Sequence, residues 1–290
     1  MATDLLETLS DNTENFIREP DRAVHLPESR KVLEISSTAA REAAGGLRIR
    51  LFDIEIDNVT LEQAVAAIVD RLDGETPVQV SFVNADCVNI ACRNPEYLAA
   101  LQESELVFAD GIGVRVAGNV LGQPVRDNVN GTDLFPRLAV ALEGTGKRIY
   151  LLGGRPGVAD GVARWLAQNY PGVALAGWRH GYFLAEEEAK VIEDIRRSGA
   201  DLVLVAFGAP RQDLWIRHCL SKLGAKVAIG VGGLLDFYSG TVPRAPRWIR
   251  KLGMEWCYRL YQEPTRLWRR YLVGNVVFLV RLAQLRLALK

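Results

Sequence analysis

The feature that most constrains this chain is a regular alternation of short apolar runs with stretches of helical spacing. The apolar runs have the length of strands, and they cover Leu47–Ile56 (as a strand or hairpin), Val78–Val83, Leu106–Ala109, Arg148–Leu152, Val173–Gly177, Leu202–Ala206 and Val227–Val231. The helical stretches cover Thr60–Leu72, Pro95–Glu103, Thr132–Leu142, a segment ending near Tyr170, Glu186–Ser198 and Gln212–Leu223. Strands separated by helices of roughly 10–15 residues are typical of βαβ units. We therefore predict an α/β fold with a mostly parallel sheet flanked by helices.

Charge divides the chain into three segments. Residues 1–47 are polar, with nine acidic and five basic side chains, and we expect them to form a flexible leader. Residues 48–247 carry the alternating pattern and should form the core. Residues 248–290 show no strand pattern, so we expect a helical appendage that Pro264 divides in two. Because eleven bases face two acids between residues 244 and 290, this end indicates an anionic partner: phosphate, nucleic acid or a membrane.

The cysteines and the termini bear on the compartment. The four cysteines form no CxxC pair and do not cluster with the three histidines, which predicts a reducing compartment and no structural zinc site. The acidic amino-terminal segment has no apolar core of a secretory signal. No run of about 18 uncharged apolar residues exists, so we expect no membrane-spanning helix.

An acidic residue follows one of the short strands. Asp110 comes directly after Leu106–Ala109, and Gly111 and Gly113 would let a ligand approach the backbone closely. Ligands of parallel sheets bind beyond the carboxyl ends of the strands, where a carboxylate can act as a general base. The alternative is an Asp that only caps the next helix.

Three glycine-rich loops also follow strands. They contain Gly153 and Gly154, Gly208 with Gln212 nearby, and Gly232 and Gly233. Such loops can hold phosphate on bare amides, and a glutamine amide can read a uracil or a sugar hydroxyl. Taken singly, each loop could be a tight turn and the glutamine a surface residue. Three loops on one sheet edge favour a continuous ligand crevice.

The carboxyl-terminal segment combines arginine, aromatic and apolar residues. Arg259, Arg266, Arg269 and Arg270 fall near one helical face, and arginine suits bidentate contacts with phosphate. From Pro264 to Lys290 there are six bases and no acid. A basic, aromatic and apolar helical segment suits an anionic bilayer surface, although a helix packed on the core is the open alternative.

Seven segments in order resemble the bacterial WecG/TagA/CpsF family of glycosyltransferases. They are Asn84-Ala85, Ala109-Asp110-Gly111, Asn130-Gly131-Thr132-Asp133-Leu134, Leu152-Gly153-Gly154 with Pro156-Gly157, Gly208-Ala209-Pro210-Arg211-Gln212, Gly230-Val231-Gly232-Gly233, and Arg244-Ala245-Pro246 continuing to Glu255-Trp256-Cys257-Tyr258-Arg259-Leu260. The resemblance covers roughly residues 48–271. It implies a Rossmann-like core and a metal-independent, inverting transferase without a cofactor. It also implies a UDP-sugar donor and an acceptor on polyprenyl diphosphate.

The resemblance also assigns roles. The proposed base falls on Asp110, the active-site asparagine on Asn84 and the glutamine on Gln212, while arginines of the appendage are thought to close over the donor diphosphate. The expected substrate-binding set is Asn84, Asn130, Asp133, Gly153, Gly154, Gly208, Gln212, Gly232, Gly233, Arg259, Arg266 and Arg269. The enzyme would work at the inner face of the cytoplasmic membrane as a peripheral protein.

Two positions depart from the family pattern. Phe82 stands where a threonine is common, and Asn128 stands where an arginine is common, although Arg126 lies nearby. Both departures bear on the choice of sugar.

Two other classes compete with a transferase. A nucleotide-dependent oxidoreductase or epimerase would need a GxGxxG after the first strand, which is missing. A non-enzymatic protein that binds anionic lipid or nucleic acid would rest on the tail alone. Residues 48–243 carry a net negative charge, which argues against nucleic acid.

Overall fold

The computed structural model describes residues 48–289, and the predicted leader, residues 1–47, lies outside them. One eight-stranded sheet has the strand order β1-β2-β4-β3-β8-β7-β5-β6. The β1–β2 hairpin is antiparallel and every other neighbouring pair is parallel. The strands are β1 (Arg48–Leu51), β2 (Ile54–Asp57), β3 (Val78–Val83), β4 (Leu106–Ala109), β5 (Arg148–Gly153), β6 (Ala174–Arg179), β7 (Leu202–Ala206) and β8 (Val227–Gly230). The predicted α/β fold with a mostly parallel sheet is confirmed.

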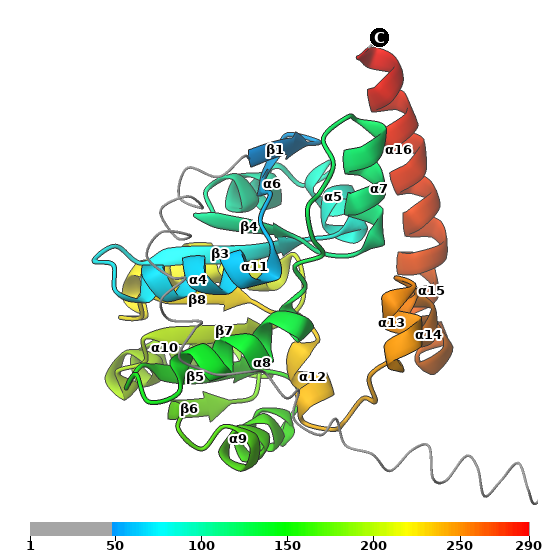
Figure 1. The fold of residues 1–290 in the computed structure, drawn as a ribbon. Coiled ribbons are helices and arrows are strands. Elements are labelled where there is room, and N and C mark those ends of the chain that lie inside the picture. Colours follow the sequence, from blue (N-terminus) through cyan, green and yellow to red (C-terminus); the bar gives the residue numbers. More distant parts are fainter. Residues whose placement is uncertain (1–47, 290) are drawn as a thin grey trace, which may run out of the picture.

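Helices cover both faces of this sheet (Figure 1). One face packs on α4 (Leu61–Leu72), α8 (Gly131–Leu142), α9 (Val158–Asn169) and α12 (Leu234–Tyr238). The other face packs on α5 (Ala85–Ala91), α6 (Pro95–Gln102), α10 (Glu188–Ser198), which follows the short 3₁₀ turn η1 (Ala185–Glu187), and α11 (Arg211–Cys219), which continues into η2 (Leu220–Lys222). The central strands β3, β4 and β8 are buried along their whole length, as expected for parallel strands covered on two sides.

Local sequence determines where α4 begins. The spacing of Thr60 and Gln63 predicts a capping box, and both of its hydrogen bonds form: Gln63 N donates to Thr60 Oγ1 at 3.3 Å, and Thr60 N donates to Gln63 Oε1 at 2.9 Å. Two of the four amides at the helix start are thereby satisfied.

Three helices at strand ends are absent from the sequence prediction: α5, α7 (Ile112–Val120) and α12. In α7 the reason is its two glycines, which lower helix propensity. A Cβ on Gly113 would lie 3.0 Å from the Cβ of Ala85, and one on Gly118 would lie 2.5 Å from the carbonyl oxygen of Gln123. The glycines that hide this helix from sequence reasoning therefore allow its close packing.

After β8 and α12, the described part of the chain contains helices alone. They are α13 (Arg247–Lys251), α14 (Glu255–Gln262), α15 (Pro264–Trp268), the π-helical turn η3 (Arg269–Val273) and α16 (Gly274–Ala288). Helix α14 ends at Gln262 and α15 begins at Pro264, so the helical segment is divided at this proline, as predicted. Figure 1 shows α13 to α16 along one side of the molecule, with α16 beside α7 and α5. We call residues 248–289 the appendage.

The helix from Pro264 to Ala288 changes one expectation. Its 25 residues are long and apolar enough to cross a membrane, by length and composition only, and 11% of its most apolar window is buried. Sequence reasoning required an uncharged run, whereas here Arg281 and Arg286 interrupt an otherwise apolar stretch. The same helix is attached to the core: Arg281 Nη1 donates to the Asn89 carbonyl oxygen at 3.0 Å, and Asn89 Nδ2 donates to the Gly274 carbonyl oxygen at 2.7 Å.

Candidate active site

A cleft of about 730 Å³ lies at the carboxyl edge of the sheet. Loops after β3, β4, β5, β7 and β8 line it on one side, and the appendage lines it on the other. Helix α7 begins in the cleft, and α9 begins three residues after Arg155, which lines it; neither helix has a side-chain cap from its own N-cap residue. Such bare helix starts carry partial positive charge and bind anions.

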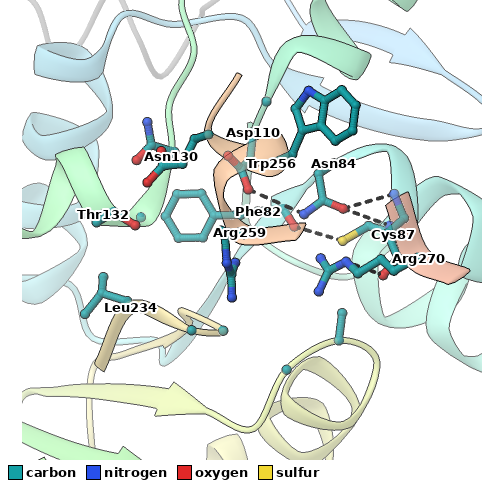
Figure 2. A pocket seen from close by; sticks show the side chains of 18 of the residues that line it. Phe82, Asn84, Cys87, Asp110, Asn130, Thr132, Leu234, Trp256, Arg259 and Arg270 are labelled. Carbon is teal, nitrogen blue, oxygen red and sulfur yellow. Dashed lines mark hydrogen bonds and ion pairs between the residues drawn. The ribbon is translucent and has the colours of Figure 1, made fainter. Parts of the chain in front are cut away.

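Asp110 lies in this cleft at the end of β4. Figure 2 shows its carboxylate facing the Asn84 side chain, and Asn84 Nδ2 donates to Asp110 Oδ2 at 3.4 Å. Burial raises the pKa of Asp110 to about 6, and the negative charge of Glu255 adds to this rise. The hydrogen bond from Asn84 and the positive charges of Arg270 and Arg259 act in the opposite direction. A carboxyl group with this pKa is mostly ionised at neutral pH and can still accept a proton.

Two asparagines hold the surroundings of Asp110. Asn84 caps α5, where its Oδ1 accepts from the backbone N–H groups of Asp86 and Cys87, both at 3.1 Å. This bond fixes the amide so that Nδ2 faces Asp110. Asn128 Oδ1 accepts from the Gly111 N–H and so holds the turn that follows Asp110. Many family members have an arginine where this chain has Asn128. Arg126 does not take the place of that arginine, because it is exposed and does not line the cleft.

Gln212 joins two of the glycine loops. Its Oε1 accepts from Gly208 N at 3.0 Å and from Gly232 N at 2.9 Å. The side chain is buried, and a Cβ on Gly230 would lie 2.7 Å from its Nε2. The amide oxygen is therefore committed to the protein backbone, and Gln212 clamps the two loops together. Gln212 also lines the cleft, and its contact with a substrate stays a prediction.

Behind Gln212 lies a buried polar cluster under the cleft. Asp213 accepts from Ser81 Oγ at 3.0 Å, and Ser81 Oγ lies 2.9 Å from Ser104 Oγ. Burial raises the pKa of Asp213 to about 7, against the opposing effect of hydrogen bonds from Ser81 and Gln212. Asp213 does not line the cleft, so the cluster supports Gln212 from below.

Asn130 and Asp133 have different positions: Asn130 lines the cleft, whereas Asp133 lies outside its lining. Asn130 caps α8 through Asp133 N at 2.8 Å and lines the cleft. Asp133 does not line it, and pairs instead with Arg244 Nη2 at 2.6 Å and Arg250 Nη1 at 3.6 Å. Burial alone would raise the pKa of Asp133, but the two arginines and Asn130 lower it. Asp133 thus attaches the start of the appendage to α8.

The predicted glycines also divide. Gly154, Gly208, Gly232 and Gly233 line the cleft, whereas Gly153 does not. Gly153 has φ +139°, and a Cβ there would lie 2.6 Å from the Ala206 carbonyl oxygen. Its role is to let β5 end close against β7.

The predicted arginines do not all face the cleft. Arg259 lines it, with its guanidinium 5.2 Å from the centre of the Phe237 ring, and Arg266 lines it while paired with Glu263 at 3.1 Å. Arg269 is exposed and lies against Trp268, outside the cleft lining. Arg270 lines the cleft in its place and pairs with Asp86 at 3.0 Å (Figure 2).

Comparison with known proteins gives the family. The family model for the glycosyl transferase WecG/TagA/CpsF family matches residues 49–290. The chain belongs to this glycosyltransferase family. An N-acetylglucosaminyldiphosphoundecaprenol N-acetyl-beta-D-mannosaminyltransferase of Bacillus subtilis is 33% identical over 69% of this chain and 77% of its own length. An enzyme with the same name from Staphylococcus aureus strain MRSA252 is 29% identical over 86% of this chain and 97% of its own length. This protein is therefore a glycosyltransferase.

Sequence reasoning missed several cleft residues of this glycosyltransferase. Glu255, Trp256, Asp236 and Arg270 line the cleft, and none was in the expected set. Glu255 and Trp256 stand in one of the quoted family segments, so a signal was present. Asp236 stands three residues after Gly233, the last glycine of the third glycine-rich loop. Within residues 48–289, no three His, Cys, Asp or Glu side chains are grouped as metal ligands.

Proposed function

We propose that this glycosyltransferase transfers an N-acetylmannosaminyl residue from a UDP-linked donor to N-acetylglucosaminyldiphosphoundecaprenol, with inversion at the anomeric carbon. Support for the acceptor and the sugar comes from the relatives, which carry that reaction in their names. The observation that carries the chemistry is the Asp110 carboxyl group, which has a pKa of about 6 and opens into a cleft also lined by arginines.

The reaction is a single displacement. Asp110 takes the proton of an acceptor hydroxyl while the hydroxyl oxygen forms a bond to the anomeric carbon. The bond from that carbon to the diphosphate oxygen breaks, and UDP leaves with the electron pair on the opposite face. One base suffices, because no covalent sugar–enzyme intermediate forms.

Negative charge that develops on the leaving diphosphate needs stabilising groups. Arg259 and Arg266 line the cleft, and the start of α9, which has no side-chain cap, follows β5 at the same sheet edge. Cationic side chains and helix N–H groups aimed at developing charge typically contribute a factor of about 10²–10³ in rate each. We assign the donor diphosphate to this end of the cleft.

The remaining site residues keep these groups in position. Asn84 orients the Asp110 carboxylate, and Gln212 holds the glycine loops after β7 and β8 at a constant separation. We assign Asn130 and the four cleft-lining glycines to substrate binding, and Asp133 and Gly153 to the frame.

The appendage is the proposed membrane contact. Its outward residues include exposed Trp268, Leu272, Val280 and Leu287 beside several arginines. Gly274 and Arg281 of α16 are hydrogen-bonded to Asn89 of α5, so inserting α16 across a bilayer would break those bonds or draw the core into lipid. We therefore propose a peripheral enzyme whose appendage lies on the inner face of the cytoplasmic membrane.

The test is transfer in detergent micelles from UDP-N-acetylmannosamine to N-acetylglucosamine linked to farnesyl diphosphate. The expected product is a disaccharide with a β linkage, identified by mass spectrometry and NMR. UDP-N-acetylglucosamine, UDP-glucose and GDP-mannose are the control donors. Failure of every UDP-sugar with this acceptor would contradict the reaction, and a clear preference for another UDP-sugar would replace N-acetylmannosamine only.

A further inference from the structure

The active-site cleft continues beyond Asp110 into an apolar trough between α7 and α16. The α7–α16 trough is lined by Ile112, Gly113, Val116, Phe278 and Leu279, all part of the same cleft as Asp110. Figure 1 shows α16 beside α7, leading away from the carboxyl edge of the sheet. The cleft thus has one end built from glycine loops and arginines and another built from aliphatic and aromatic side chains.

One wall of the trough is an apolar stripe on α7. Ile112, Val116 and Val120 are four residues apart, so they lie on one helical face, and they are 42%, 36% and 40% exposed. Ile112 and Val116 line the cleft, and Val120 extends the same face beyond it. A surface helix normally turns its apolar face inward. A continuous exposed stripe on a helix that starts at the catalytic loop is therefore a candidate binding surface.

The other wall is α16, and the core holds it in place. Phe278 is buried and packs beside Gly113 of α7, where a Cβ would be in ordinary van der Waals contact with its ring at 3.7 Å. Leu279 stays 53% exposed at the side of the trough. Hydrogen bonds from Arg281 and Asn89 hold α16 against α5, so the trough is a permanent part of the fold.

The occupant must have a polar end at Asp110 and an apolar chain leading away from it. The acceptor in the proposed function has this form, with a sugar hydroxyl at one end and an isoprenoid chain at the other. From the continuity of the trough with the catalytic cleft, we infer that it binds the first isoprene units of the acceptor's lipid. This inference rests on the proposed function, and it gives the chain a fixed path instead of leaving it in the surrounding lipid.

The experiment compares two acceptors in detergent micelles, N-acetylglucosamine diphosphate carrying farnesyl and the same diphosphate carrying methyl. Wild-type enzyme should prefer the farnesyl acceptor in kcat/KM. Val116→Asn should lower that preference by about tenfold, because apolar burial of a few methylene groups is lost. Val116→Leu should keep it. Val276→Asn is the matched control, since Val276 is 61% exposed on α16 outside the cleft lining, and it should keep the preference.

Three outcomes would overturn the inference. The first is an unchanged preference in Val116→Asn, and the second is an equal loss in Val276→Asn, which would put the lipid on the outer surface of α16. The third is loss of vesicle flotation in Val116→Asn, which would make the stripe a membrane contact. Transfer by the wild type to neither acceptor would instead contradict the proposed function. Thermal unfolding and UDP binding of each variant verify that the fold is intact.

Discussion

The carboxyl edge of the sheet and the appendage hold their polar groups in different ways. At the sheet edge, Asn84 and Gln212 are held by neutral hydrogen bonds to backbone amides, and Gln212 is buried. In the appendage, the Arg266 side chain is 56% exposed and is held by an ion pair with Glu263. Exposed ion pairs contribute little to stability and are easily rearranged. The base is therefore fixed by the core, whereas part of the positive charge comes from an exposed arginine that can adjust to a substrate.

Asp133 connects the two regions. It pairs with Arg244, which also pairs with Glu255 at 3.3 Å, and Glu255 raises the pKa of Asp110. The position of the appendage is therefore linked electrostatically to the base.

The first prediction removes a positive charge that the appendage supplies to the cleft. Arg259→Gln should lower kcat by about 10²–10³, because it removes one charge from the leaving diphosphate. Arg269→Gln should cost far less, since Arg269 lies outside the cleft. Steady-state kinetics with both substrates measure this contrast. Equal losses in the two variants would mean that the appendage turns on substrate binding to bring Arg269 inward.

The second prediction concerns Gln212, which holds the loops after β7 and β8 together. Gln212→Ala should lower the free energy of unfolding by about 1–3 kcal/mol, because two loop amides lose their acceptor. Urea denaturation followed by circular dichroism measures it. The control is His218→Ala, an exposed position on the same helix, with an expected change within about 0.5 kcal/mol. A wild-type stability in Gln212→Ala would show that the clamp does not hold the loops.

The third prediction tests the electrostatic effect of Glu255 on Asp110. Because Asp110 acts as a base only when ionised, kcat/KM should be constant above its pKa of about 6 and fall about tenfold per pH unit below it. Glu255→Gln removes a negative charge that raises this pKa, so the inflection should move to lower pH. A pH–rate profile of both proteins measures the shift. An inflection that moves to higher pH would contradict the link.

Much of the fold follows from the sequence, because parallel strands are short, apolar and separated by helices. The strands from β3 to β8 and the site at their carboxyl ends are predictable in this way. The short helices α5, α7 and α12 are not, since they have few turns and α7 contains two glycines that only tertiary packing explains.

The arginines show a second limit of sequence reasoning. With about 100° per residue, Arg269 and Arg270 lie on either side of the direction of Arg266, about 60° and 40° away. Helical spacing therefore cannot choose between them, and packing of Arg270 against Asp86 decides. Similarly, the sequence shows Gln212 next to a glycine loop but not that its oxygen bonds to two loops far apart in the chain.

We propose that Asp110 is the base of this transferase and that UDP binds independently of it. The most direct measurement is Asp110→Asn, assayed for turnover and, by calorimetry, for UDP binding. We predict a fall in kcat of about 10²–10⁴, the usual contribution of a general base, with the UDP dissociation constant within about threefold of wild type. Near-normal turnover with intact UDP binding would contradict the account.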